Sequence, residues 1–183
     1  MKEERCILQI DKDPKAVIEP DYEKQPFKFH SKLLFAFVPK EDIANFLEQV
    51  PHKVLGSYDT ISFQPDIYEI ESNGEYFTLC QAPLGAPAAT QLLDGLIAYG
   101  VKKVLAFGNA GALVDLPENE MFIPTKAIRD EGTSFHYLED SLMVDLNTEF
   151  LSQVKNVITE LDYKYDEVTT WTTDAFLEKH RKK

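Results

Sequence analysis

Polar and titratable side chains crowd into one short stretch of this sequence. Residues 129–137 read Arg-Asp-Glu-Gly-Thr-Ser-Phe-His-Tyr. Guanidinium, carboxylate and hydroxyl groups at this density can bind a polar ligand. They can equally satisfy one another in a hydrogen-bonded turn, with Arg129 paired to Asp130 or Glu131. The residue types alone leave both interpretations open.

A glycine-rich turn forms a second candidate site. Val104-Leu105-Ala106-Phe107 is a short apolar run typical of a buried parallel strand, and Gly108-Asn109-Ala110-Gly111-Ala112 follows it. Ligands of open α/β sheets bind at the carboxyl ends of strands, and successive backbone N–H groups in such a turn can hold an anion. An ordinary strand-to-loop turn would use the same glycines, so these residues alone do not decide between the two interpretations.

The elements before this turn form a βαβ unit. Pro83-Leu84-Gly85-Ala86-Pro87 predicts a rigid loop with one flexible point, because proline fixes φ and glycine permits φ > 0. Apolar residues at helical spacing predict a helix over 88–99 that ends at Gly100. Residues 121–125 predict a further strand that ends at or near Pro124.

The other predicted elements complete an α/β pattern. Asn73-Gly74 predicts a hairpin between two strands, and Asn147 or Thr148 caps a helix. That helix is expected to turn its apolar side chains inward, namely Phe150, Leu151, Val154, Val157, Ile158 and Leu161. Residues 52–64 show no clear pattern. The remaining expected elements are strands at 33–38, 67–70, 76–80 and 168–171 and a helix at 43–50.

Length and composition indicate one globular domain that spans residues 1–183. The formal net charge of −12 argues against nucleic acid and anionic membrane surfaces as partners. The absence of a long apolar run argues against a membrane span, and the first five residues lack a signal-peptide core. Two cysteines are too few for a disulfide framework, and the four histidines lack metal-ligand spacing. We therefore expect a cytoplasmic protein without a metal site.

Four blocks of the sequence resemble the nucleoside phosphorylase family, which includes uridine phosphorylase, hexameric purine nucleoside phosphorylase and methylthioadenosine/adenosylhomocysteine nucleosidase. Residues 83–87 resemble its G-M-G-x-P loop, and residues 108–113 resemble its G-[ST]-x-G-[AG]-L turn. Residues 127–134 resemble its A-x-R-x-[DE]-G-[TA]-S signature. Residues 171–176, Trp-Thr-Thr-Asp-Ala-Phe, are similar to the segment that places an aromatic ring against the base. The resemblance implies a three-layer αβα sandwich with a central mixed sheet.

The resemblance also assigns residues to a nucleoside site. Leu84 has the position of a ribose-contacting methionine, and Asn109 lies beside the nucleophile position. Phe176 is placed to stack on the base, with a role as a core aromatic as the alternative. The remaining assignments are Gly85, Gly108 and Ala110 for substrate binding, and Arg129, Glu131, Thr133 and Ser134 for bracing the site.

The sequence departs from the family pattern at the phosphate ligands. Residues 12–16, Lys-Asp-Pro-Lys-Ala, stand in for a G-D-P-x-R block, so Ala16 replaces its arginine. Ala106 replaces the arginine that usually ends the central strand, and Asn109 replaces a hydroxyl residue. Alanine cannot donate to phosphate, although Lys12 or Lys15 could partly substitute as point charges.

A second departure concerns the end of the chain. The family's Met-Glu pair for the ribose hydroxyls and its aspartate for the leaving base come later than residue 183, so no catalytic residue is assigned. We expect a C-terminally truncated form of the family's domain.

Three functions remain open at this point. The first is phosphorolysis of the N-glycosidic bond of a purine or pyrimidine nucleoside, with phosphate as co-substrate and no cofactor. The second is hydrolysis of the same bond by water, suggested by Ala16 and Ala106. The third is a non-catalytic remnant that binds a nucleoside. The resemblance further implies a homo-oligomer, either a dimer or a hexamer, with a small-molecule nucleoside as its partner.

Overall fold

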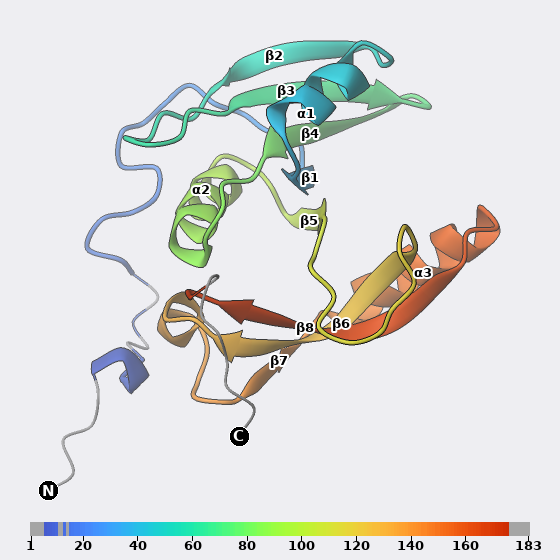
Figure 1. The fold of residues 1–183 in the computed structure, drawn as a ribbon. Coiled ribbons are helices and arrows are strands. Elements are labelled where there is room, and N and C mark those ends of the chain that lie inside the picture. Colours follow the sequence, from blue (N-terminus) through green and yellow to red (C-terminus); the bar gives the residue numbers. More distant parts are fainter. Residues whose placement is uncertain (1–5, 11–12, 14, 176–183) are drawn as a thin grey trace, which may run out of the picture. The chain divides into compact units, whose positions relative to one another are not determined.

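A computed structural model describes residues 6–10, 13 and 15–175 (Figure 1). The chain divides into two compact units. One is Asp13–Gly111, and the other joins Met1–Lys12 to Ala112–Lys183. Each unit is described by itself below.

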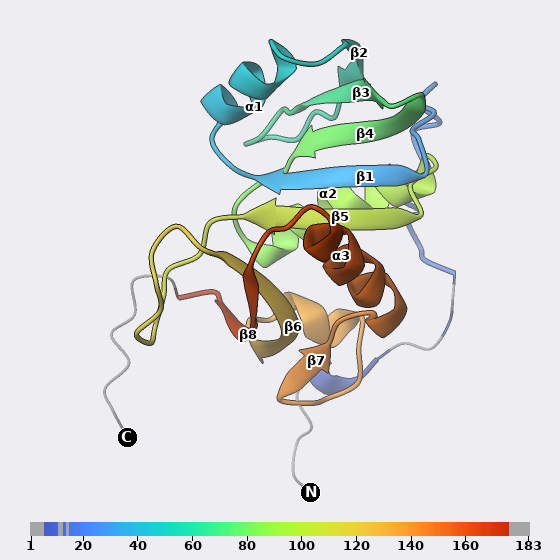
Figure 2. The same cartoon turned by 90° about the vertical axis from the view of Figure 1, so that its right-hand side faces the viewer.

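The unit at residues 13–111 is built on a mixed five-stranded sheet in the order β2-β3-β4-β1-β5 (Figure 2). Strand β1 runs parallel to both β4 and β5, whereas β3 is antiparallel to β2 and β4. The predicted parallel strand after the βαβ helix is therefore confirmed. The strands are β1 Lys32–Phe37, β2 His52–Ser57, β3 Asp66–Ser72, β4 Glu75–Gln81 and β5 Lys103–Gly108.

Two helices cover opposite faces of this sheet. Side chains alternate between faces along a strand, so Phe35 and Ala36 of β1 enter different cores. Helix α2 (Ala86–Ala98) buries Leu92 and Leu96 on the Phe35 face, whereas α1 (Lys40–Leu47) buries Ile43 and Leu47 on the Ala36 face. The result is a helix–sheet–helix arrangement of three layers within this unit.

Helix α2 ends as the sequence predicts. Gly100 has φ 127°, and its N–H donates to the carbonyl of Ile97 over 3.1 Å. The N–H of Val101 reaches back to the carbonyl of Leu96, also over 3.1 Å, which completes a Schellman motif. Val101 and Leu96 are both buried in one core, so the turn also makes the apolar contact that accompanies this motif.

The hairpin between β3 and β4 also follows its local signal, because Asn73 and Gly74 have φ 53° and 76°. Strand β2, in contrast, lies in the stretch for which no element was predicted. It is an edge strand with a register shift between Val54 and Gly56, and this irregularity breaks the alternation by which strands are recognised.

The second unit contains a three-stranded sheet in the order β7-β6-β8. Strand β6 runs parallel to β8 and antiparallel to β7. Its elements are the 3₁₀ helices η1 (Cys6–Leu8) and η2 (Thr133–His136), strands β6 (Met121–Asp130), β7 (Met143–Asp145) and β8 (Tyr165–Thr173), and helix α3 (Thr148–Glu160).

The predicted end of strand β6 at Pro124 is wrong. The strand continues to Asp130, so Arg129 lies within it and not in a loop. The pairing with β8 shifts register between Pro124 and Lys126, and this irregularity accommodates a proline that has no N–H to donate. Strand β8 likewise begins at Tyr165, three residues before the predicted start.

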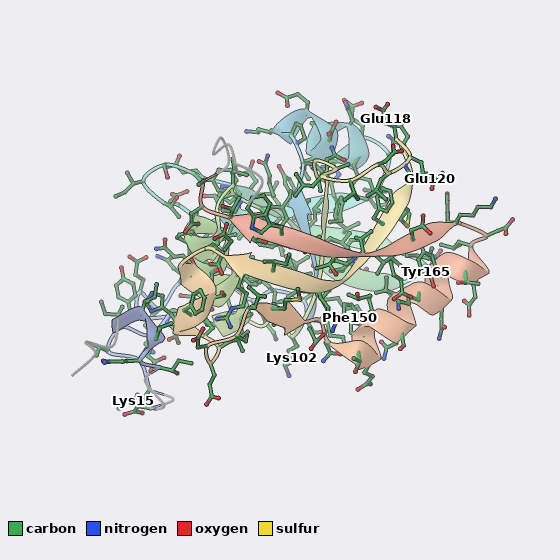
Figure 3. All side chains as sticks on the ribbon, turned by 60° about the horizontal axis from the view of Figure 1, so that its bottom comes forward. Lys15, Lys102, Glu118, Glu120, Phe150 and Tyr165 are labelled. Atoms are coloured by element: carbon green, nitrogen blue, oxygen red, sulfur yellow. The ribbon has the colours of Figure 1, made fainter. Side chains whose placement is uncertain are left out.

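Helix α3 begins at its predicted cap, where the N–H of Phe150 donates to Asn147 Oδ1 over 2.8 Å. Figure 3 shows Phe150 in the first turn of this helix and Tyr165 at the start of β8. The predicted inward face is only partly correct. Phe150, Leu151, Val154 and Ile158 are half-buried, but Val157 and Leu161 are 53% and 62% exposed. No helix among the described residues is long and apolar enough to cross a membrane.

Candidate functional site

The loop Pro83–Pro87 leaves the carboxyl end of β4 and starts α2. Gly85 is the residue before the helix, with φ 98° and ψ 134°, and its carbonyl accepts the N–H of Ala89 over 3.0 Å. Leu84 is 92% exposed, so its side chain is open to a ligand. The glycine between the two prolines thus has the positive φ that the sequence predicts.

The glycine-rich turn begins at Gly108, the last residue of β5. A Cβ on Gly108 would lie 2.6 Å from the carbonyl oxygen of Phe37, so close packing against β1 explains this glycine. Asn109 and Ala110 follow with exposed side chains. The expected burial of β5 is wrong for this unit: β5 is the edge strand next to β1, and Phe107 is 45% exposed.

These two loops lie at the same edge of the five-stranded sheet. Strands β4 and β5 are both parallel to β1, so their carboxyl ends point the same way. The structure therefore brings together the predicted substrate-binding residues of this unit at the edge where α/β proteins bind ligands. These residues are Leu84, Gly85, Gly108, Asn109 and Ala110.

Two of the three glycines in these loops, Gly85 and Gly111, provide a matched test of the loop geometry. Gly85→Ala should lower the free energy of unfolding by about 1–3 kcal/mol, because an L-residue is strained at φ 98° although the space for a Cβ is open. Gly111→Ala should change it by less than about 1 kcal/mol, because Gly111 also has open space and no positive φ. Urea unfolding of both variants measures the difference, and equal losses would contradict this geometry.

A hollow of about 230 Å³ lies beside the carboxyl ends of β1 and β4. The amide of Gln81 donates from Nε2 to the carbonyl of Val38 over 2.8 Å and so joins the two strand ends. Lys40 adds a positive charge to the lining and Asp66 a negative one. The hollow is lined by Lys40, Ile43, Ser62, Phe63, Gln64, Pro65, Asp66, Tyr68 and Gln81.

Sequence reasoning missed this hollow. Lys40 follows Pro39, which ends the first predicted strand, and a cation directly after a strand is the one local signal for it. The other lining residues come from helix α1, the loop at 62–65 and strands β3 and β4, so only the folded arrangement brings them together.

The polar stretch at 129–137 belongs to the other unit, and Arg129 organises it. Its guanidinium is buried and donates from Nε to Ser134 Oγ over 2.8 Å and from Nη1 to Ser141 Oγ over 2.7 Å. It also reaches the carbonyls of Glu139 (2.7 Å) and Leu138 (3.2 Å). The self-satisfied turn is therefore what the structure shows, but with hydroxyl and carbonyl acceptors in place of the expected Asp130 or Glu131 carboxylate.

Glu131 and Thr133 complete this turn. The buried carboxylate of Glu131 accepts the N–H of Ser134 over 2.9 Å and also the hydroxyl of Ser134. Thr133 is half-buried at the first position of η2. Every buried side-chain nitrogen and oxygen in the described part of the chain has a hydrogen-bond partner. These contacts occupy the polar side chains of Arg129, Glu131 and Ser134, and the bracing role stays a prediction.

The end of β8 contacts this same turn. The indole N–H of Trp171 donates to Asp130 Oδ2 over 3.1 Å, and the N–H of Gly132 donates to Asp174 Oδ2 over 2.9 Å. The block at 171–176 thus lies against the polar stretch through its first four residues. Phe176, the predicted base-stacking residue, lies outside the described residues, as do Lys12 and Pro14 of the block at 12–16.

The described residues contain no group of three or more histidine, cysteine, aspartate or glutamate side chains that could hold a metal ion. Burial raises the pKa of the Cys80 thiol to about 12, so this cysteine is protonated at neutral pH. The thiolate is the nucleophilic form of cysteine, and Cys80 is therefore a core residue and not a candidate nucleophile.

The fold is similar to solved structures of a uridine phosphorylase and of two nucleosidases. The uridine phosphorylase from Vibrio fischeri matches 85% of this chain and 63% of its own, with a TM-score of 0.68 and 20% identity. The Helicobacter pylori nucleosidase (MTAN) matches 81% of this chain and 69% of its own, with a TM-score of 0.61 and 18% identity. The 5′-methylthioadenosine/S-adenosyl homocysteine nucleosidase from Campylobacter jejuni matches 80% and 66%, with a TM-score of 0.63 and 17% identity.

This likeness confirms the predicted α/β sandwich with a central mixed sheet. The chain spans 63% of the length of the uridine phosphorylase that it matches. A search of curated protein sequences finds no match.

A family model described as the phosphorylase superfamily matches residues 33–183. The match begins within β1, so the block at 12–16 lies before it. Most of the chain lies within the match, and the resemblance seen in the sequence is confirmed. The chain belongs to the phosphorylase superfamily.

Proposed function

We propose that this protein binds a nucleoside at the carboxyl ends of β4 and β5 and cleaves its N-glycosidic bond with phosphate as the nucleophile. The observation that carries the proposal is that two glycine-containing loops leave the mixed sheet at the same edge. Leu84 and Asn109 project from those loops with exposed side chains. An exposed apolar group and an amide at the same sheet edge suit a ribose, which has ring carbons and hydroxyl groups.

The chemistry of the reaction sets what the site must supply. Glycosidic cleavage passes through a transition state with oxocarbenium character, so the ribose must be held while a nucleophile approaches its anomeric carbon. In this proposal, Asn109 and the backbone N–H groups of its turn orient that nucleophile. Leu84 packs against the sugar in this proposal.

The ligand class has support from the solved structures. The Helicobacter pylori nucleosidase has been solved with a pyrrolidin-3-ol that carries an amino-pyrrolopyrimidine group. A heteroaromatic base joined to a five-membered ring is the layout of a nucleoside. We extend this ligand class to the present chain.

Lys40 supports phosphate as the co-substrate, because it supplies a positive charge to the hollow that Gln81, the last residue of β4, also lines. No cofactor takes part in this proposal. The acceptor of the leaving base is not assigned to any residue of the chain.

Hydrolysis by water is the second candidate, favoured by Ala106. This residue lies on β5, two positions before Gly108, and its exposed methyl group cannot donate a hydrogen bond to phosphate. Asp66 in the lining of the hollow adds negative charge, which also opposes phosphate.

A thermal-shift panel of uridine, adenosine, inosine and methylthioadenosine, each with and without phosphate, tests the proposal. A nucleoside at about one hundred times its Kd stabilises the folded state by about 2.7 kcal/mol, which raises the Tm by about 5–10 °C. A further rise with phosphate, accompanied by release of the free base, is the expected result. Base release without a phosphate effect would replace phosphorolysis by hydrolysis, and no shift with any nucleoside would contradict nucleoside binding.

The variant Ala106→Arg tests whether phosphate binds next to position 106. An arginine at this exposed position should tighten phosphate binding about tenfold or more through charge-assisted hydrogen bonds. Ala98→Arg adds the same charge at the exposed end of α2 and is the matched control. Equal phosphate effects in the two variants would show that position 106 does not face the phosphate.

A further inference from the structure

The hairpin turn between β3 and β4 holds an asparagine directly before a glycine. Ser72 pairs with Glu75, so Asn73 and Gly74 are the two central residues of the turn (Figure 1). Both have positive φ, 53° and 76°, as a tight hairpin turn requires. Both are exposed, and a Cβ on Gly74 would meet nothing within 4 Å. The backbone of this turn is therefore open to water.

Hydrogen bonds do not hold the two groups of this pair that could react with each other. Among the residues that the structure describes, neither the side-chain amide of Asn73 nor the N–H of Gly74 has a hydrogen-bond partner. The side chain of Asn147, in contrast, is held at the start of α3 because its Oδ1 accepts the N–H of Phe150 over 2.8 Å. The Asn73 amide is thus free to turn toward the backbone nitrogen that follows it.

We propose that Asn73 is a site of non-enzymatic deamidation in the folded protein. The Gly74 N–H loses its proton to hydroxide, and its nitrogen attacks Asn73 Cγ. The new N–C bond closes a succinimide ring, and the Cγ–Nδ2 bond breaks, so that ammonia leaves with a proton taken from water. One water molecule then opens the ring. The net reaction consumes one water and releases one ammonia, and it needs no oxidant, reductant or cofactor.

The ring opens to two products. Attack of water at Cγ gives aspartate, whereas attack at the main-chain carbonyl carbon gives isoaspartate, in which the backbone runs through the side-chain methylene. Either product adds one negative charge between Glu71 and Glu75. Isoaspartate also lengthens the turn by one backbone atom, so the turn no longer matches the pairing of Ser72 with Glu75. The isoaspartate form should therefore unfold at a lower temperature than the variant Asn73→Asp, which has the same charge.

Asn119 is a matched control within the same chain. It is exposed, lies in a turn and has φ 61°, close to the φ of Asn73, but Glu120 follows it. A side chain on the following residue crowds the attacking nitrogen and restricts the backbone, whereas glycine does neither. Asn73 should therefore lose its amide about tenfold or more faster than Asn119 in the folded protein.

The experiment incubates the full chain in water enriched in oxygen-18, at neutral and at mildly alkaline pH. Peptide mass spectrometry follows the loss of the amide and the uptake of one oxygen-18 atom at Asn73 and at Asn119, and electron-transfer fragmentation separates aspartate from isoaspartate. The rate at Asn73 should rise with the hydroxide concentration. Gly74→Ala should slow it about tenfold or more, because a Cβ then crowds the attacking nitrogen.

Two results would overturn the inference. Equal rates at Asn73 and Asn119 in the folded protein would show that the glycine does not direct the reaction, and this comparison does not require Gly74→Ala to fold. Loss of the Asn73 amide in urea but not in the folded protein would show that the turn keeps the amide away from the nitrogen. The turn precedes β4 and Leu84 follows it, so the inference does not depend on the proposed nucleoside site.

Discussion

Replacing Arg129 by alanine should lower the free energy of unfolding by about 3–5 kcal/mol. The guanidinium is buried and donates to Ser134 Oγ, Ser141 Oγ and the carbonyls of Leu138 and Glu139. A hydrogen bond to a charged group contributes about 1.5–3 kcal/mol, and water entering the vacated space would replace part of that. Urea unfolding followed by far-UV circular dichroism measures the loss.

The guanidinium is also stacked on an aromatic ring, with its central carbon 4.2 Å from the centroid of Phe135. Lysine would keep the charge but lose the planar fork and this stacking, so Arg129→Lys should recover less than half of the loss. The matched control is Lys126→Ala on the same strand. Lys126 is exposed and pairs with Asp145 over 3.3 Å, so its removal should cost less than about 1 kcal/mol. Similar losses in Arg129→Ala and Lys126→Ala would contradict the role given to Arg129.

The contacts of Arg129 show where reasoning from the sequence stops. The density of polar groups at 129–137 correctly indicated a hydrogen-bonded turn, but the nearest carboxylates were the expected partners. The observed acceptors include Glu139 and Ser141, which are ten and twelve residues away. The chain after Arg129 folds back so that these later residues reach its buried guanidinium. The choice of partner therefore depends on the course of the backbone over about ten residues, which the residue types next to Arg129 do not determine.

Elements with strong local signals were predicted well. The Asn73-Gly74 hairpin, the Asn147 cap and the helix that ends at Gly100 each depend on backbone preferences within a few residues. Strands β2 and β7 lack such signals: β2 is an edge strand with a register shift, and β7 has three residues. The continuation of β6 past Pro124 depends on β8, which comes some forty residues later.

In the candidate site, too, the local features were predicted and the long-range ones were not. The motifs placed Leu84, Gly85 and Asn109 in loops at strand ends, because loop chemistry is local. The hollow that holds Lys40 and Gln81 was not predicted, since its lining is assembled from separate segments. The bond between Gly132 and Asp174 was missed for the same reason, because forty-two residues separate its two partners.

Gly100→Ala should be as damaging to the first unit as the loss of Arg129 is to the second, at about 3–5 kcal/mol. Gly100 has φ 127°, where an L-residue is strained by about 1–3 kcal/mol. A Cβ would also lie 2.7 Å from the carbonyl oxygen of Phe29, and a backbone atom cannot rotate away. Relief of this overlap requires a backbone shift, which typically costs a further 1–3 kcal/mol.

Gly74→Ala separates the cost of a positive φ from the cost of the overlap with the Phe29 carbonyl. Gly74 also has a positive φ, 76°, but a Cβ there would meet nothing within 4 Å, so this variant should lose only about 1 kcal/mol. The difference between the two variants in urea unfolding measures the overlap with Phe29.

Gly100 joins α2 to β5, and β5 carries Gly108 and Asn109 at its other end. A shift at Gly100 would therefore pass along β5 to the proposed nucleoside loops, and the folded Gly100→Ala protein should bind nucleoside more weakly than Gly74→Ala does. Equal affinities in the two variants would show that the loops are positioned independently of this turn.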